Sequence, residues 1–411
     1  LQGKEKVLRP KGDERQNFRG TTRHSPLTRR TQTDNGATRP DLLENVQPEA
    51  RGGRPALPAG SAHSNAPSLS PHSAAGGPVT AFLLYRQNFN IFLQRLQGKS
   101  AGDLTIFLRY IIIISKKAAL RQMGERKMAD ISVMDAERLC GWLPRRARET
   151  HKGDFGRILL LCGAVGYTGA PALAAMGAAR SGAGLIFVGV PEPVYPIVAG
   201  KLLEPMVFPL PAQGGMLAES AVPEILARLS GCDACLIGCG LGRSAGTFAA
   251  VQAVLANASC PVVVDADGIN VLEGHIDVLR GAACPVVLTP HDGEYRRLMG
   301  RLPGENRMGA AAALAEKTGA TVLLKGHRTA ICGADERWEN RCGNPGLATG
   351  GSGDVLAGIL VSLLGQGLPP VHAAAAAAWL HGTAADRCAA RMGEYGLLPS
   401  DVAAELPYLL P

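Results

Sequence analysis

The feature that most constrains this chain is a series of short, wholly apolar segments that alternate with longer stretches of helical composition. Residues 157–161 form such an apolar run, which is followed by Gly163, and the Ala-rich residues 170–181 then favour a helix. Further apolar runs and helical stretches lie at residues 184–190, 235–237, 247–256, 262–264, 286–288, 310–317 and 322–324. Strands that are apolar on both faces and alternate with helices are typical of a mostly parallel sheet covered on both sides. The sequence therefore predicts an α/β fold.

This pattern begins only after the first third of the chain. Residues 1–80 are rich in Arg, Pro, Ser, Gly and Thr, and residues 52–78 have a composition typical of disorder. The composition changes abruptly at Met128. We therefore predict one α/β domain at residues 128–411, preceded at residues 1–127 by a basic extension that is disordered or mistranslated from an upstream segment. A functional basic tail that binds RNA or a membrane surface is the alternative.

The positive charge of the chain belongs to this extension. The whole chain carries a formal net charge of +8, but residues 1–127 contain 21 Lys and Arg against 9 Asp and Glu, a net charge of +12. Residues 128–411 contain 22 Lys and Arg against 26 Asp and Glu, a net charge of −4. The basic character therefore gives no reason to assign nucleic acid as a partner of the α/β domain.

The ten cysteines indicate buried thiols rather than disulfides or a zinc site. They are too sparse for a disulfide scaffold in a chain of 411 residues. Cys232, Cys235 and Cys239 have a spacing used by zinc sites, but no second Cys or His pair follows, and a strand would point alternate residues to opposite faces. We predict core cysteines in a reducing cytoplasm and no metal ligands among the side chains.

No segment predicts secretion or insertion into a membrane. The first residues are charged and lack the apolar core of a signal peptide. The most apolar stretch, residues 104–114, is interrupted by Arg109 and is shorter than the roughly 20 residues that a spanning helix needs. We therefore expect a cytoplasmic protein with no membrane partner.

The strongest local signal is the glycine-rich run GNPGLATGGSGD at residues 343–354, which leads directly into the apolar residues 355–360. Glycines at the start of a helix let backbone N–H groups approach an anion, and the helix dipole favours negative charge there. Asp354 lies in the first turn of the predicted helix. A simple N-terminal cap is the alternative role for Asp354, but it does not account for the density of glycines. We therefore predict a phosphate-binding loop.

This loop resembles that of the ADP-dependent NAD(P)H-hydrate dehydratases, which belong to the ribokinase-like superfamily. Further motifs agree in the same order over residues 140–410: HKGDFG at 151–156, GYTGAP at 166–171, GAGL at 182–185, GCGLG at 238–242, DADGIN at 265–270, LTPHDGE at 288–294 and LKGHRT at 324–329. Agreement of several independent motifs is implausible by chance. The resemblance implies a ribokinase-like fold, with a mostly parallel central sheet and helices on both faces.

The resemblance also implies roles for individual residues. Those assigned to the hydrated nicotinamide substrate are Ala170, Gly240, Gly242, His291 and Asp354. Those assigned to the nucleotide are Lys325, Gly326, His327, Arg328 and Thr329 in one segment and Gly351, Ser352 and Gly353 in the glycine-rich loop. Taken without the resemblance, the two substrate glycines indicate a tight turn, a lone histidine is usually structural, and residues 325–329 would form a solvated hairpin turn.

The sequence leaves more than one role open for two acidic residues, Asp265 and Glu294. Asp265 follows the predicted strand at 262–264, so its side chain should emerge at the edge of the sheet where open α/β folds bind ligands. It could serve a magnesium ion, make a structural contact or cap a helix at 267–272. Glu294 could orient His291 or merely lie in the first turn of a helix.

The chemistry that the resemblance implies needs a base and an anion site. The substrates are the S epimers of hydrated NADH and NADPH (NADHX and NADPHX), whose ring hydroxyl leaves readily only after phosphorylation. We expect Asp354 to act as general base on that hydroxyl and the N–H groups of residues 351–353 to hold the transferring phosphoryl group. Magnesium would bridge the nucleotide phosphates. ADP is implied as the donor, which would give AMP and phosphate.

Two other functions are alternatives. A kinase of the same fold, acting on hydroxymethylpyrimidine or hydroxyethylthiazole, would share the loop and Asp354, but the motifs around His291 and Lys325 favour the dehydratase. A non-catalytic nucleotide-binding or RNA-associated protein would use the basic tail, but the intact loop argues against it. The resemblance further implies a homo-oligomer, a tetramer. Because residues 1–127 contain nothing like the nucleotide loop of an epimerase, a separate NAD(P)HX epimerase is the expected functional partner.

Overall fold

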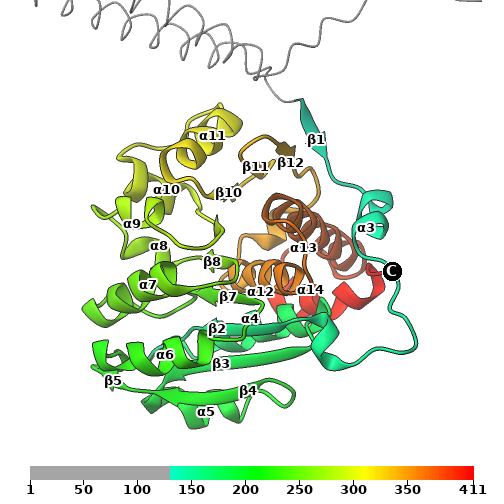
Figure 1. Ribbon diagram of the computed structural model, residues 1–411. Helices are drawn as coiled ribbons and strands as arrows, with labels where there is room; N and C mark the ends of the chain where they lie inside the picture. The colour runs from blue at the N-terminus through cyan, green and yellow to red at the C-terminus, as the bar shows by residue number, and fades with distance from the viewer. Residues whose placement is uncertain (1–129) are drawn as a thin grey trace, which may run out of the picture. The chain divides into compact units, whose positions relative to one another are not determined.

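In residues 130–411, which the computed structural model describes, ten strands form one sheet (Figure 1). The strands in chain order are β1 (Ile131–Val133), β2 (Arg157–Leu161), β3 (Leu185–Pro191), β4 (Met206–Leu210), β7 (Ala234–Ile237), β8 (Val262–Val264), β9 (Val286–Leu288), β10 (Thr321–Leu324), β11 (Ala330–Cys332) and β12 (Arg337–Glu339). A separate hairpin pairs β5 (Ala212–Gln213) with β6 (Met216–Leu217). The predictions made for residues 1–127 lie outside the described residues.

Neighbouring strands of the sheet run parallel except at β11. The strand order is β1-β12-β11-β10-β9-β8-β7-β2-β3-β4, and β11 pairs antiparallel with both β10 and β12. The chain adds β3 and β4 on one side of β2 and places β7 to β10 on the other, so the strand order reverses between β2 and β7. Open parallel sheets bind ligands outside the carboxyl ends of their strands at such a reversal. The predicted mostly parallel sheet is confirmed, and its topology indicates where a site should lie.

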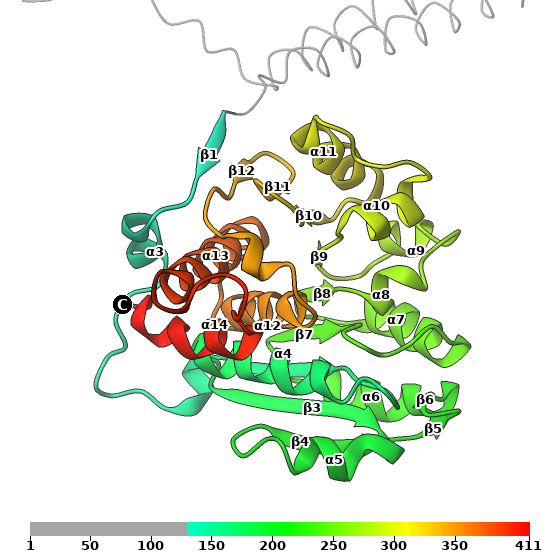
Figure 2. The ribbon, with the colours of Figure 1, turned by 180° about the vertical axis from the view of Figure 1, so that it is seen from behind.

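Alternate residues of the central strands contribute to two apolar cores. In β2, Ile158 and Leu160 belong to one core, and Leu159 and Leu161 belong to the other. The helices that cover the first face are α4 (Gly169–Arg180), α12 (Ser352–Gly365), α13 (Pro370–Met392) and α14 (Pro399–Glu405). Those that cover the second face are α6 (Val222–Leu229), α7 (Ala245–Asn257), α10 (Asp292–Met299) and α11 (Arg307–Thr318) (Figures 1 and 2). Helices therefore lie on both faces, as predicted. In this described part of the chain, no helix combines the length and apolarity needed to cross a membrane.

Helices α4 and α12 cross at very short range. A Cβ atom on Gly358 of α12 would lie 2.1 Å from the Ala174 carbonyl oxygen of α4, and a Cβ on Gly177 of α4 would lie 2.5 Å from the Val355 carbonyl oxygen of α12. Both distances are shorter than any real contact, so only glycine is compatible with this crossing. Because the glycine-rich loop leads into α12, the crossing also fixes the position of the end of that loop relative to the sheet.

Candidate active site

The glycine-rich loop opens α12 in the manner that the sequence predicts. Gly351 precedes the helix with a φ of +96°, a left-handed conformation that favours glycine, and it brings no side chain to cap the helix. The first N–H groups of a helix have no partners within it and are suited to bind an anion. Ser352 N–H donates a long hydrogen bond of 3.3 Å to the Thr349 carbonyl. Asp354 is the third residue of α12 and not its cap, so the simple-cap interpretation of Asp354 is wrong.

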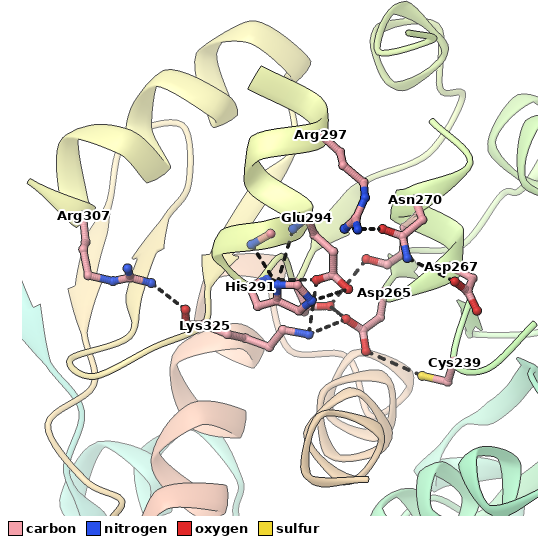
Figure 3. Close-up of polar contacts among 12 residues, drawn as sticks. Cys239, Asp265, Asp267, Asn270, His291, Glu294, Arg297, Arg307 and Lys325 are labelled. Atoms are coloured by element: carbon pink, nitrogen blue, oxygen red, sulfur yellow. Dashed lines mark hydrogen bonds and ion pairs between the residues drawn. The ribbon is translucent and has the colours of Figure 1, made fainter. Parts of the chain in front are cut away.

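Three side chains from the ends of neighbouring strands meet beside this loop, and Figure 3 shows two of them, Asp265 and Lys325, pointing toward each other. Asp265 follows β8, Thr289 follows β9 and Lys325 follows β10. Asp265 Oδ1 accepts hydrogen bonds from Lys325 Nζ at 2.8 Å and from Thr289 Oγ1 at 2.7 Å. A Cβ atom on Gly353 would lie 3.6 Å from Lys325 Nζ. The edge of the sheet therefore brings an ammonium group against the first turn of α12.

Asp265 has a structural role in this arrangement. The helix that follows it, α8 (Asp267–Asn270), has Ala266 at its cap position and no capping hydrogen bond from that side chain. The prediction that Asp265 caps this helix is therefore wrong, and the helix ends two residues earlier than expected. Its buried carboxylate instead joins the ends of β8, β9 and β10.

Asp354, which is half-buried, forms an acidic cluster with the buried side chains of Asp265 and Cys239. One polar atom from each of these three side chains lies within 4.8 Å of the other two. Cys239 Sγ donates to Asp265 Oδ2 at 3.6 Å (Figure 3). Burial, together with the negative charge of Asp265, raises the pKa of Asp354 to about 6. A carboxylate with this pKa is ionised at neutral pH and still accepts a proton readily, which is what a general base requires.

Two carboxylates keep Lys325 charged. Burial alone lowers the pKa of Lys325, but Asp265 and Glu294 raise it above its usual value. Glu294 Oε2 lies 3.7 Å from Lys325 Nζ, and burial raises the pKa of Glu294 while Lys325 opposes that change. Lys325 is therefore a fixed positive charge at neutral pH.

His291 lies at the start of α10 and is oriented by the residues that follow it. Its Nδ1 accepts hydrogen bonds from the backbone N–H groups of Gly293 at 2.9 Å and Glu294 at 3.4 Å. The backbone N–H of His291 donates to Glu294 Oε2 at 2.9 Å, so His291 and Glu294 form the reciprocal pattern of a capping box. Glu294 Oε1 also lies 3.3 Å from His291 Nε2. Glu294 thus both orients His291 and lies in the first helical turn, so the two interpretations offered for it hold together. The His291 side chain is 55% exposed and remains accessible to a ligand.

The other residues assigned to the substrate form a second group, at the ends of β2 and β7. Gly240 has a φ of +64°, and a Cβ atom on it would lie 2.9 Å from the Cβ of Ala170 at the start of α4. Gly242 has a φ of +74° and donates its N–H to Asp267 Oδ2 at 2.9 Å. The tight turn expected from the glycines is therefore present, and it places Ala170 beside Gly240. Cys239, which directly precedes this turn, joins the second group to the acidic cluster.

The residues assigned to the nucleotide in the turn between β10 and β11 divide into two sets. Lys325 is bonded to Asp265 of the acidic cluster, whereas Gly326, His327 and Arg328 are exposed. Arg328 has a left-handed φ of +57° and pairs with Glu339 at 2.9 Å. Thr329, the last of the five, donates its hydroxyl to the carbonyl at position 326 at 3.0 Å. The solvated-turn interpretation therefore describes the exposed set and does not describe Lys325.

The acidic cluster has the spacing of a metal site but not the chemistry of a magnesium site. Magnesium prefers oxygen ligands, whereas one of the three groups is a thiol. A hydrogen bond with Cys162, together with burial, raises the pKa of Cys239 well above its usual value, so the thiol stays protonated. Asp265 Oδ1 is already engaged by Lys325 and Thr289. These contacts fit a site that moves protons and do not fit a magnesium ion held by these three side chains.

Residues 158–408, well over half of the chain, match the model of the NAD(P)H-hydrate dehydratase family. The chain belongs to this family. The matched range contains both groups of residues described above, and the predicted resemblance is confirmed.

Two curated members of the family match this chain over different shares of their own length. The bifunctional NAD(P)H-hydrate repair enzyme Nnr of Moorella thermoacetica is 44% identical over 273 residues, which cover 65% of this chain and 52% of that protein. The ADP-dependent (S)-NAD(P)H-hydrate dehydratase of Neisseria meningitidis serogroup B is 38% identical over 268 residues, which cover 63% of this chain and 86% of that protein. The chain therefore spans about half the length of the bifunctional relatives it matches.

Solved structures of similar proteins identify the fold of this family member. The ADP/ATP-dependent NAD(P)H-hydrate dehydratase of Bacillus subtilis, co-crystallised with ATP and Mg²⁺, has a TM-score of 0.59 and 30% identity, covering 68% of this chain and 98% of that one. A ribokinase-like superfamily protein of Enterococcus faecalis has a TM-score of 0.60 and 29% identity, covering 68% of this chain and 95% of that one. The predicted ribokinase-like fold is confirmed.

Three polar residues at the site of this family member have roles that the sequence did not suggest. Cys239 is buried, as predicted for a core cysteine, but its thiol also contacts Asp265. Thr289 was assigned no role, and neither was His381, a buried residue of α13 whose Nε2 lies 3.3 Å from Ser352 Oγ. The Ala-rich sequence around His381 gave no signal for a polar contact. Thr289 and Asp265 each come directly after an apolar strand, and this shared position is a signal that could have linked them.

Proposed function

We propose that the chain catalyses the ADP-dependent dehydration of the S epimer of hydrated NADH and NADPH, regenerating NADH or NADPH and releasing AMP and phosphate. The observation that carries this proposal is the position of Asp354, a carboxylate with a pKa of about 6 in the first turn of a helix that opens with glycines. The Neisseria meningitidis relative is named for the same ADP-dependent reaction, which supports the choice of donor and substrate.

The first step proposed is transfer of a phosphoryl group to the substrate. Asp354 takes the proton of the ring hydroxyl, the hydroxyl oxygen bonds to the terminal phosphorus of ADP, and the bond from that phosphorus to AMP breaks. The N–H groups that open α12 and the ammonium of Lys325 stabilise the negative charge on the transferring group. Burial of the cluster strengthens these interactions, because charges attract more strongly where water is excluded.

The second step restores the reduced nicotinamide ring. The new phosphate ester leaves with its bonding electron pair as inorganic phosphate, and loss of a ring proton re-forms the double bond. The atoms of the removed water are thus accounted for in the phosphate and the released proton. Asp354 returns to its ionised form when its proton passes to solvent.

The same proposal places the two ligands at the carboxyl edge of the sheet. The hydrated nicotinamide ring contacts Ala170, Gly240, Gly242 and His291, and the nucleotide contacts the exposed turn after Lys325 together with the loop at 351–353. Magnesium carried by the ADP phosphates would offset part of their charge. Co-crystallisation of the Bacillus subtilis relative with ATP and Mg²⁺ supports a nucleotide–metal complex as the donor.

The proposed function is tested by incubating the protein with hydrated NADH, ADP and Mg²⁺. We expect the absorbance of NADH to return, with AMP and phosphate formed in equal amounts, and a parallel reaction with ATP compares the two donors. A small-molecule kinase of the same fold would consume its donor without restoring the absorbance. No recovery with either donor would contradict the proposal.

We also propose that the protein acts in the cytoplasm as a homotetramer and that a separate epimerase supplies it with the S epimer. Sedimentation analysis measures the oligomeric state. For the second partner, the expected result is that a pure preparation repairs only part of a mixture of both epimers. Repair of the whole mixture by the protein alone would contradict the need for a separate epimerase.

A further inference from the structure

Helix α13 contacts the glycine-rich loop at both of its ends. His381 Nε2 lies 3.3 Å from the hydroxyl oxygen of Ser352, at the end of the loop that opens α12. Five residues further along α13, Asp386 Oδ2 accepts a hydrogen bond from Gly343 N–H at 2.8 Å, and its Oδ1 accepts one from Asn344 Nδ2 at 2.9 Å. Two side chains of a single helix therefore hold the loop near its beginning, at Gly343 and Asn344, and near its end, at Ser352.

Close packing of α13 against the loop makes these contacts possible. A Cβ atom on Gly382 would lie 2.6 Å from the carbonyl oxygen of Cys342, so the backbone of α13 approaches the start of the loop more closely than any larger residue permits. Asn344, held by Asp386, in turn accepts a hydrogen bond from Gly346 N–H at 3.0 Å and shapes the turn that follows. The anchoring at Asp386 thus extends into the loop through Asn344.

The contact between His381 and Ser352, at the other end of the loop, is shielded from solvent. His381 and Ser352 are both almost fully buried, at 7% and 6% exposed. Burial lowers the pKa of His381 to about 4, so its ring is neutral and adds no charge beside the anion-binding turn. A buried polar group without a partner costs about 1–3 kcal/mol, so each of these two groups favours the geometry in which it meets the other.

We propose that His381 and Asp386 are positioning residues that hold the glycine-rich loop, and with it the first turn of α12, in the geometry needed for phosphoryl transfer. They act through Ser352 and Asn344 and do not themselves reach the reacting atoms. The inference rests on the proposed function of the loop, but the anchoring it describes is measurable without catalysis.

The test compares two substitutions of His381 with a matched control on the same helix. His381→Leu removes the hydrogen bond, and we expect kcat to fall by up to about 10²-fold with a smaller change in the KM for ADP, because misplaced groups cost most in the transition state. His381→Gln places an amide nitrogen near the position of Nε2 and should retain most of the activity. The control is His372→Leu, at a residue that stacks on Trp142 and pairs with Glu336, away from the loop.

Hydrogen exchange supplies a readout that does not depend on activity. We expect the amides of residues 352–354 to exchange faster in His381→Leu, and those of Gly343, Asn344 and Gly346 to exchange faster in Asp386→Ala, whereas His381→Gln and His372→Leu should match the wild type. Unchanged exchange in His381→Leu and Asp386→Ala would contradict the anchoring, as would a wild-type kcat in His381→Leu. A loss of kcat in His372→Leu as large as that in His381→Leu would contradict it too.

The same measurements separate this inference from the proposed function. A wild-type protein that restores no NADH contradicts the function, while the exchange experiment still decides whether α13 holds the loop. If His381→Leu does not fold, Ser352→Ala removes the hydroxyl partner and keeps the backbone N–H. We then expect faster exchange and a lower kcat in Ser352→Ala, and wild-type values of both would overturn the proposal.

Discussion

The two carboxylates of the acidic cluster are committed to different tasks by their neighbours. Asp265 is bonded to Lys325 and Thr289, which ties it to the strand ends and to a fixed positive charge. Asp354 is half-buried close to that negative charge, and its pKa rises to about 6. Active sites often contain two nearby carboxylates whose environments give them different pKa values, and one of the two then exchanges protons during catalysis. At the scale of residues, this difference supports the proposal that Asp354 is the base.

Asp354→Asn tests the base directly. The amide keeps the shape of the side chain but cannot take the proton of the substrate hydroxyl, so we predict a loss of about 10²–10⁴ in kcat. The substitution also removes a charge that burial opposes, so the free energy of unfolding should not fall. Steady-state kinetics and thermal unfolding check the two parts of this prediction, and a variant with wild-type kcat would rule out Asp354 as the base.

The pH dependence of the reaction should report the same carboxylate. A general base works in its ionised form, so kcat/KM should fall as the pH drops through about 6, the pKa of Asp354. Because the charge of Asp265 raises that pKa, Asp265→Asn should move the acidic limb of the profile to lower pH, whatever its effect on the maximal rate. Asp335→Asn, at an exposed turn residue, serves as the control and should leave the limb in place. A limb that stays at the same pH in Asp265→Asn would contradict the proposed coupling.

At the scale of elements, the position of Asp354 depends on the crossing of α4 and α12. Gly177 and Gly358 let the two backbones approach until each glycine faces a carbonyl oxygen of the other helix. Any Cβ atom at either position would push the helices apart. Asp354, the proposed base, and the proposed anion-binding N–H groups would then move with α12, because they lie in its first turn.

Gly358→Ala is predicted to disturb this crossing. Overpacking of a tightly packed core typically costs about 1–3 kcal/mol, so the free energy of unfolding should fall by that amount. Displacement of catalytic groups by about 1 Å can cost up to about 10²-fold, so kcat should fall as well. The matched control is Gly141→Ala in helix α3 (Ala136–Trp142), where a Cβ would meet no atom within 4 Å and where alanine should stabilise the helix by about 0.5–1 kcal/mol. Unchanged stability and kcat in Gly358→Ala would contradict the proposed role of the crossing.

Sequence patterns predicted the strands that are covered by helices on both faces, because burial on both faces requires a continuous apolar run. The central strands β2, β3, β7, β8, β9 and β10 are apolar on both faces because helices cover both, and they were expected within about one residue of their observed bounds. Strand β4 was not predicted: it lies at the edge of the sheet, contains Pro209 and exposes Met206. Strands β11 and β12 are three residues each, and β12 carries charged residues at both ends.

The site was predictable where its signal is local and not where the fold creates it. The glycine-rich loop and Asp354 are adjacent in the sequence, so their spacing alone predicts an anion-binding turn with a carboxylate. Asp265 and Lys325 are 60 residues apart and meet only because their strands lie near each other in the sheet. The same holds for His381 and Ser352, which α13 brings together.

At the scale of the whole molecule, the complete site lies within the part of the chain whose net charge is negative. Residues 158–408 match the family, and 68% of this chain covers nearly all of the Bacillus subtilis relative. The net charge of +12 is confined to residues 1–127, outside that matched range. We therefore expect neither the fold nor the proposed reaction to need the basic residues 1–127.

Removal of residues 1–127 is predicted to leave kcat and KM unchanged, because residues 128–411 supply every side chain assigned to the reaction. The full chain should in addition bind RNA weakly at low salt and release it as salt is raised, since non-specific binding depends on the release of counterions by basic residues. The shortened chain, with a net charge of −4, should not bind RNA. Kinetics with hydrated NADH and RNA binding at several salt concentrations measure both effects, and thermal unfolding verifies that the shortened chain is folded. A folded variant with a much lower kcat would mean that the basic segment contributes to the active site.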